Sequence, residues 1–156
     1  MIVIVIVQSA VISRLNLAHG SADIVMLALI AISLQHRTKR AILWFVFGGL
    51  LVSIISAIPL MYPLIPYLMI GLIIEYIRKR VWKIPLLMMI IISFVGTLIS
   101  CTFGYLTINF IQVQLPLETS IFSVFFPSAA FNVALGIPIY LVVADWTSWL
   151  NPKDEE

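Results

Sequence analysis

Few side chains in this chain could act in acid–base, nucleophilic or metal chemistry, and they do not form a catalytic set. The two histidines, His19 and His36, lie in separate loops, which the membrane topology predicted here places on opposite sides. The single cysteine, Cys101, lies in an apolar run, where a buried and unreactive thiol is expected. The sequence has no zinc-spaced Cys and His set, no phosphate-binding glycine loop and no G-x-S-x-G element. We therefore expect no enzyme activity, no metal, no cofactor and no nucleic-acid partner.

Three acidic residues lie at the edges of apolar runs. Asp23 could bind a ligand, but capping of the helix that begins there is the simpler role. Glu75 precedes two basic residues by three and four positions, which predicts a local ion pair on one helix face rather than a proton relay. Asp145 follows a long uncharged run and is expected to reach the membrane surface.

The elements that carry these side chains are long apolar segments. The chain has 156 residues, of which 62% are hydrophobic and 10% are charged, whereas a soluble domain has about a quarter charged residues. This composition predicts an all-α integral membrane protein, because lipid then provides the apolar solvent. We expect residues 1–150 to form a single transmembrane helical bundle and residues 151–156 to form a short cytoplasmic tail.

The apolar runs, with the prolines, glycines and basic residues that separate them, predict a bundle of six transmembrane helices. Their approximate bounds are 2–13, 22–35, 41–58, 63–77, 84–111 and 127–149. The first run gives roughly 20 Å of helix against a hydrocarbon core of about 30 Å, so five spans is the alternative. Residues 121–127 contain three phenylalanines before a proline, which predicts either an interfacial segment or an extension of the last span.

The positive charges predict the orientation of these spans. Loops rich in Lys and Arg stay in the cytoplasm, so we expect the two basic clusters, at 36–40 and 78–83, and both termini on the cytoplasmic side of the membrane. The same clusters form a membrane-surface region where anionic lipid could bind. They consist of Arg37, Lys39, Arg40, Arg78, Lys79, Arg80 and Lys83.

Small residues recur inside two of the predicted spans and predict close helix packing. Such a face lets two helix backbones approach each other. Two interpretations are open: packing within the bundle, or a docking face for the single helix of another protein. The residues are Gly48 and Gly49 in the third run, and Gly96, Ser100 and Gly104 in the fifth.

Polar, proline and aromatic residues add expectations about the bundle. Asn132 should bond to a neighbouring helix, because an unpaired amide is costly in hydrocarbon. Pro138 should kink the last helix. Tyr62 and Tyr67 toward the outer side, and the tryptophans toward the cytoplasmic side, predict an aromatic belt. The tryptophans are Trp44, Trp82, Trp146 and Trp149.

Several of these residues occur in an order along the predicted spans that is typical of one family of membrane proteins. A Gln closes the first span, an Asp opens the second, a Gly-Gly-Leu-Leu stretch lies in the third, a Gly lies in the fourth, and Pro-x4-Asn-x5-Pro-x-Tyr lies in the last. The residues that match are Gln8, Asp23, Gly48-Gly49-Leu50-Leu51, Gly71, Pro127, Asn132, Pro138 and Tyr140. This pattern resembles the MreD family of rod-shape-determining membrane proteins. The chain departs from that family at Ala22, where proline is usual, and at Ser53, where many members carry aspartate.

The resemblance implies a non-enzymatic, multi-pass subunit of the bacterial cell-elongation (rod) complex in the cytoplasmic (inner) membrane. This complex supports cell-shape control and lateral peptidoglycan synthesis. Such a subunit would bind the bitopic protein MreC and help to couple MreB filaments to the RodA polymerase and its class B penicillin-binding transpeptidase. The resemblance also implies a fold similar to the S components of energy-coupling-factor transporters. The alternative function is a substrate-binding S component of a vitamin-type transporter, with an outer pocket near Asp23, Asn109 and Glu118.

Overall fold

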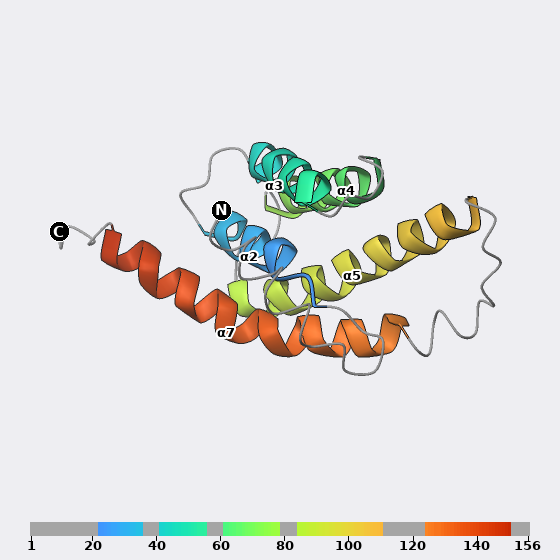
Figure 1. The fold of residues 1–156 in the computed structure, drawn as a ribbon. Coiled ribbons are helices and arrows are strands. Elements are labelled where there is room, and N and C mark those ends of the chain that lie inside the picture. The colour runs from blue at the N-terminus through green and yellow to red at the C-terminus, as the bar shows by residue number, and fades with distance from the viewer. Residues whose placement is uncertain (1–21, 36–40, 56–60, 79–83, 111–123, 151–156) are drawn as a thin grey trace.

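The structure of the chain is a computed structural model that describes residues 22–35, 41–55, 61–78, 84–110 and 124–150 (Figure 1). These ranges contain five helices and no strand, which confirms the expected all-α class for this part of the chain. The helices are α2 (Ile24–Ser33), α3 (Ala41–Ile55), α4 (Met61–Arg78), α5 (Pro85–Phe110) and α7 (Phe126–Leu150). The predicted first span at 2–13, the tail at 151–156 and most of both basic clusters lie outside the described residues.

Two of the helices are long and apolar enough to cross a membrane. The apolar windows are Pro85–Thr107 in α5 and Phe126–Thr147 in α7. At 26 and 25 residues, α5 and α7 are each about 38 Å long. The other three apolar helices are shorter, and α2 has only 10 residues.

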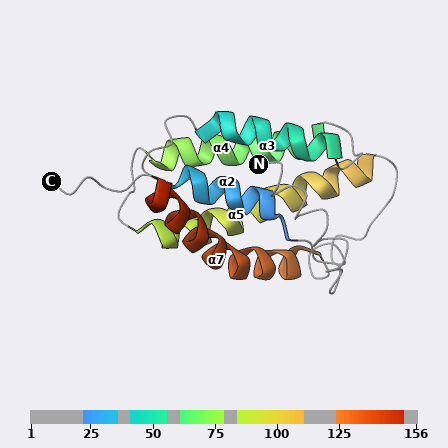
Figure 2. The same ribbon diagram turned by 60° about the vertical axis from the view of Figure 1, so that its left-hand side comes forward.

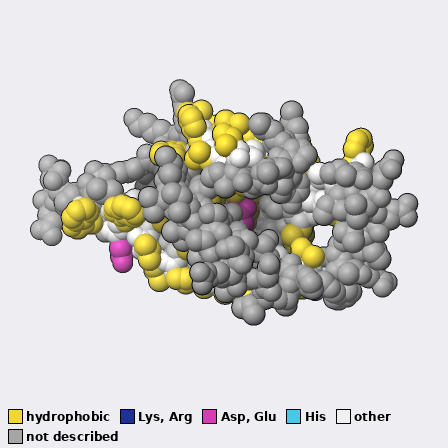
Figure 3. Space-filling model, in the orientation of Figure 1, with side chains coloured by type: hydrophobic (Ala, Val, Ile, Leu, Met, Phe, Trp, Pro, Cys, Tyr) yellow, Lys and Arg dark blue, Asp and Glu magenta, His cyan; other side chains and the backbone are white. Residues whose placement is uncertain are grey.

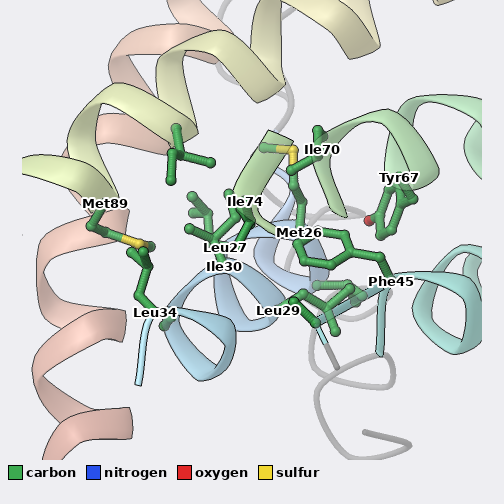
Figure 4. Close-up of a cluster of buried hydrophobic side chains, with 14 residues drawn as sticks. Met26, Leu27, Leu29, Ile30, Leu34, Phe45, Tyr67, Ile70, Ile74 and Met89 are labelled. Atoms are coloured by element: carbon green, nitrogen blue, oxygen red, sulfur yellow. The ribbon is translucent and has the colours of Figure 1, made fainter. Parts of the chain in front are cut away.

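The shortest helix lies at the centre of the molecule. In both ribbon views α2 lies between a layer made by α3 and α4 and a layer made by α5 and α7 (Figures 1 and 2). Seven residues of α2 have no solvent-accessible surface: Val25, Met26, Leu27, Leu29, Ile30, Ala31 and Ser33. Around them lie Ile70 and Ile74 of α4, Phe45 of α3 and Met89 of α5 (Figure 4). Because protein surrounds α2, its short length does not have to match the thickness of a bilayer.

The contacts between helices define their directions. In α3 and α4, Phe45 lies beside Gly71 and Gly49 lies beside Leu64, so the two helices are antiparallel. In α2 and α7, Asp23 bonds to Asn132 and Gln35 bonds to Thr147, so these two helices are parallel.

The helices α5 and α7 are antiparallel, since Thr97 bonds to Asn132 and Ser93 lies beside Gly136. The carboxyl ends of α2, α4 and α7 therefore lie at one end of the bundle, together with the amino ends of α3 and α5 (Figure 2). Residues 36–40 and 79–83, which contain every basic residue of the two clusters except Arg78, follow or precede helix ends at this end. We call it the basic end.

The surface of the described helices is mainly apolar, and Figure 3 shows hydrophobic side chains over much of what is coloured. The only charged residues in the described ranges are Asp23, Glu75, Arg78 and Asp145. Water-soluble monomers rarely expose large contiguous apolar areas, so this surface suits lipid. The large apolar side chains that are more than half exposed are Phe47, Ile54, Leu72, Tyr76, Ile84, Leu106, Phe110, Phe126, Leu141, Val142, Trp146 and Trp149.

The last helix begins with an aromatic contact to α5. The ring of Phe125 meets the rings of Phe94 and Phe126 edge to face, with centroids 5.7 and 5.5 Å apart. Residues 124 and 125 form a helical turn that leads into α7, which agrees with an extension of the last span there, while 121–123 lie outside the described residues. Pro138 lies inside α7, and this helix changes direction along its length in both ribbon views, as expected for an internal proline.

Candidate functional site

Four polar side chains from four elements meet inside the bundle. The backbone N–H of Asp23, just before α2, donates to Asn132 Oδ1 of α7 over 2.9 Å. Asn132 Nδ2 donates to Thr97 Oγ1 of α5 over 2.8 Å. The hydroxyl of Tyr67 in α4 lies 2.7 and 2.8 Å from the two carboxylate oxygens of Asp23 and donates to this carboxylate. We call Asp23, Tyr67, Thr97 and Asn132 the polar cluster.

Asp23 caps α2, as the sequence predicted. Its Oδ1 accepts the backbone N–H of Met26 over 3.0 Å, which satisfies one of the free N–H groups at the start of the helix. The same carboxylate accepts the Tyr67 hydroxyl, so one side chain caps α2 and also joins it to α4.

Asp23 is also connected to helices other than the one that it caps. Through Asn132 it is linked to Thr97, which lies near the middle of α5, the longest helix described. An ionisable residue packed between helices needs partners within the protein, and the polar cluster provides them.

Asn132 is buried, with 2% of its surface exposed, and both the oxygen and the nitrogen of its side-chain amide form hydrogen bonds. The oxygen accepts from α2 and the nitrogen donates to α5, which confirms the expected bond to a neighbouring helix. Thr97 is equally buried, and its hydroxyl donates a hydrogen bond to the carbonyl of Ser93 over 2.7 Å. A buried donor left unpaired costs about 1–3 kcal/mol, so these bonds favour one packing of α2, α5 and α7.

Tyr67 lies in the core and not in an outer aromatic belt, so that prediction was wrong for this residue. Only 2% of its surface is exposed, and its ring meets Phe45 of α3 edge to face with centroids 6.3 Å apart. A buried tyrosine needs a partner for its hydroxyl, and Asp23 is that partner. Trp44, Trp146 and Trp149 are exposed, as residues of a belt would be.

The small residues on α3 and α5 face other helices of the same chain. A side-chain carbon added at Gly48 would collide with Leu29 of α2, and one at Gly49 would lie 3.3 Å from the Cα of Leu64 in α4. At Gly96 it would lie 3.1 Å from the sulfur of Met26.

Ser100, one turn further along α5, points its hydroxyl at the sulfur of Met26 over 4.0 Å, and Gly104 is buried. The small residues at 48, 49 and 96 therefore serve packing within the bundle. At these three positions no room is left for a helix of another protein.

A second polar contact joins α2 to α7 near the basic end. The Thr147 hydroxyl lies in hydrogen-bond contact with Gln35 Oε1 and also with the carbonyls of Val143 and Ala144. Ser33 Oγ and Gln35 Nε2 are buried and have no hydrogen-bond partner among the described residues. Polar contacts thus hold both ends of α2 against α7.

The other candidate residues from the sequence are not found in the polar cluster. Asn109 donates to the carbonyl of Tyr105 in its own helix over 3.1 Å, and Glu118 lies outside the described residues. Of the basic residues, Arg78 is the last residue of α4, while Arg37, Lys39, Arg40, Lys79, Arg80 and Lys83 lie outside the described ranges. Among the described residues, no group of three or more His, Cys, Asp and Glu could hold a metal ion.

The polar cluster joins four elements of the bundle by hydrogen bonds. Each of its side chains is bonded to another element, and its one carboxylate is engaged with a helix start and a phenol. Comparison of the chain with models of known families, with curated proteins and with solved structures found no match. The functional interpretation therefore rests on the residues of the chain and their geometry.

Proposed function

We propose that this chain is a non-enzymatic subunit of the bacterial cell-elongation complex that binds MreC in the cytoplasmic membrane. The observation that carries the proposal is the bond between Asp23 and Asn132. Both residues belong to the MreD-like pattern, and they meet in one cluster although 109 positions separate them.

Other residues of the pattern line the same region. Gly49 packs against Tyr67, the residue that donates to Asp23, and Gly71 packs against Phe45. The residues of the pattern therefore lie close together in the fold. The convergence therefore supports a resemblance that extends to the way the helices pack.

The proposed protein is a multi-pass bundle of six spans with both termini in the cytoplasm. Support comes from the lengths of α5 and α7, from the apolar surface, and from the scarcity of charged residues in the described ranges. The two basic clusters connect helix ends at the same end of the bundle. That arrangement is the one required if positive loops stay in the cytoplasm.

In this proposal the basic end faces the MreB filament and anionic lipid, while the helices contact MreC. Through MreC the protein would belong to the wider assembly of MreB, RodA and the class B penicillin-binding transpeptidase. Gly48, Gly49 and Gly96 pack against helices of the same chain. The contact with MreC is therefore expected on the exposed helix faces.

The alternative, an S component of a vitamin transporter, requires an outer ligand pocket near Asp23 and Asn109. The Asp23 carboxylate is bonded to α2 and α4, and Asn109 is bonded within α5. Nothing among the described residues brings the two side chains together. The MreC-binding subunit is therefore the better supported function.

Depletion in the rod-shaped host tests the proposal. After the inducible gene is switched off, cells should become round, and incorporation of a fluorescent D-amino acid should no longer follow the lateral wall. A copy with Asn109→Leu should restore the rods, since Asn109 bonds only within α5 among the described contacts. Depleted cells that stay rod-shaped but fail to grow on a limiting vitamin would support the transporter subunit instead.

A further inference from the structure

One side of α7 is packed on the bundle, and the other side is exposed. On the packed side, Asn132 is bonded to the start of α2 and to α5, and Thr147 contacts Gln35 of α2. Exposed residues share the opposite side of the helix, because each lies three, four or seven positions from another. They are Ala134, Leu141, Val142, Asp145 and Trp149, which we call the α7 outer face.

The α7 outer face is apolar except for one carboxylate. Among the acidic residues of the described ranges, Asp145 is exposed, whereas Asp23 and Glu75 are partly buried. Figure 3 shows an acidic side chain beside hydrophobic side chains along the carboxyl-terminal part of α7. The face therefore combines a large apolar area with a negative charge.

Asp145 lies inside the part of α7 that would cross the membrane. The apolar window of this helix runs from Phe126 to Thr147, and α7 continues to Leu150, about 8 Å beyond Asp145. Ionisable residues within membrane spans are costly on a side that faces lipid, and they usually face protein or water. A protein that covered this face would remove that cost.

Charge determines which partner fits the face. The carboxyl end of α7 lies at the basic end of the bundle, which is cytoplasmic in the proposed function. A single-span helix that runs beside α7 into the cytoplasm carries Lys or Arg there, because positive residues flank the cytoplasmic ends of spans. Those cations would meet Asp145, whereas the head groups of anionic lipid would be repelled by it.

We propose that the α7 outer face binds the transmembrane helix of MreC, and that a basic residue at the cytoplasmic end of that helix pairs with Asp145. The inference rests on the proposed function and adds the surface and the charge that recognise the partner. Leu141 and Trp149 pack against apolar side chains of the bound helix. Ala134 lets the two backbones approach each other, since its side chain is small.

Photocrosslinking from single positions of the full chain, in its host, tests the surface. A benzophenone amino acid replaces Val142 on the α7 outer face, or Leu72 on α4 and Leu106 on α5 as matched controls. The three side chains are similarly exposed, at 61%, 56% and 55%. We expect a covalent product with MreC from position 142 and little or none from positions 72 and 106. Mass spectrometry identifies the product.

The charge is tested with the same photoreactive group at position 142. Asp145→Lys should lower the yield of the MreC product about tenfold, because like charges would then face each other across the contact. Asp145→Asn, which keeps the size of the side chain, should lower the yield by less. Glu75→Lys makes the same change of net charge on α4 and should leave the yield unchanged.

The outcomes separate the inference from the proposed function. Capture of MreC from position 72 or 106 as efficiently as from 142 would overturn the inference while the proposed function stands. A product of position 142 with a second copy of the chain, or with no protein at all, would overturn it too. An unchanged yield with Asp145→Lys would overturn the charge pairing. If MreC neither crosslinks from any position nor co-purifies with the unsubstituted chain, the proposed function itself fails.

Discussion

The backbone N–H of Asp23 donates to the side-chain oxygen of Asn132 over 2.9 Å, across 109 positions of sequence. This bond fixes the start of the central helix α2 on α7. The amide nitrogen of Asn132 continues the connection to Thr97 in α5, and the Asp23 carboxylate continues it to Tyr67 in α4. One residue from each of four elements is therefore needed to complete the polar cluster.

Replacement of Asn132 should destabilise the bundle without unfolding it. Asn132→Leu leaves the backbone N–H of Asp23 without its acceptor in the interior. We expect a loss of about 1–2 kcal/mol, since hydrogen bonds between helices in membranes measure toward the low end of the range for buried donors. Equilibrium unfolding in mixed micelles with SDS, followed by circular dichroism, measures the loss.

Asn109→Leu is the matched control for this measurement, because Asn109 bonds to Tyr105 of its own helix. Its effect should stay within about 0.5 kcal/mol. Equal losses at positions 109 and 132 would contradict the structural role assigned to the polar cluster.

Tyr67 and Asp23 should be energetically coupled. Tyr67→Phe removes the hydroxyl that donates to the carboxylate, and Asp23→Asn keeps a side chain that can cap α2. We expect a coupling free energy of about 0.6–1.7 kcal/mol from the double-mutant cycle. The same cycle with Tyr76→Phe, whose side chain is 64% exposed, should give no coupling. Additive effects of the substitutions at 23 and 67 would argue against the bond.

Gly49 should not tolerate a larger side chain. Its Cβ position is 3.2 Å from the Cβ of Tyr67 and 3.3 Å from the Cα of Leu64, so the backbone of α4 blocks it. Gly49→Val should destabilise by about 1–3 kcal/mol through overpacking. Ala134→Val, on an exposed position of α7, is the control and should be near neutral. A stable Gly49→Val protein would contradict the close packing of α3 on α4.

The helix positions were predictable where long apolar runs end at charges or prolines. The runs at 84–111 and 127–149 correspond to Pro85–Phe110 and Phe126–Leu150, and the run at 41–58 begins where α3 begins. Basic residues mark the ends of such runs because a charge is costly inside an apolar helix, and a proline marks a helix start because it fits the first turn best. Each of these residues affects the helix in which it lies, so the helix ends can be recognised in a single sequence without knowledge of the fold.

The arrangement of the helices was not predictable in the same way. The residues of α2 are apolar on every side, so no face marks it as the helix that other helices surround. Tyr67 shows the same difficulty, since a tyrosine near a predicted membrane edge fits an aromatic belt as well as a core. Only the contact with Asp23, 44 positions away, distinguishes the two. The need of Asn132 for a partner was predictable, but not the partner.

The orientation can be tested by labelling single cysteines. With Cys101→Ala as the background, Lys39→Cys and Arg80→Cys should react with a membrane-impermeant maleimide only after the inner membrane is opened. Glu118→Cys, on the predicted outer side, should react while the inner membrane is intact, because positive loops are retained in the cytoplasm. Reaction of residue 39 or 80 before the inner membrane is opened would contradict the predicted orientation.

The central claim, that this bundle binds MreC in the membrane, is tested most directly by co-purification. The tagged chain, extracted from its host in a lipid-like detergent, should retain MreC near equal stoichiometry through size-exclusion chromatography. An unrelated multi-pass protein of similar size, carrying the same tag, should retain none. If MreC is absent while circular dichroism shows that the purified chain is helical, the account is contradicted.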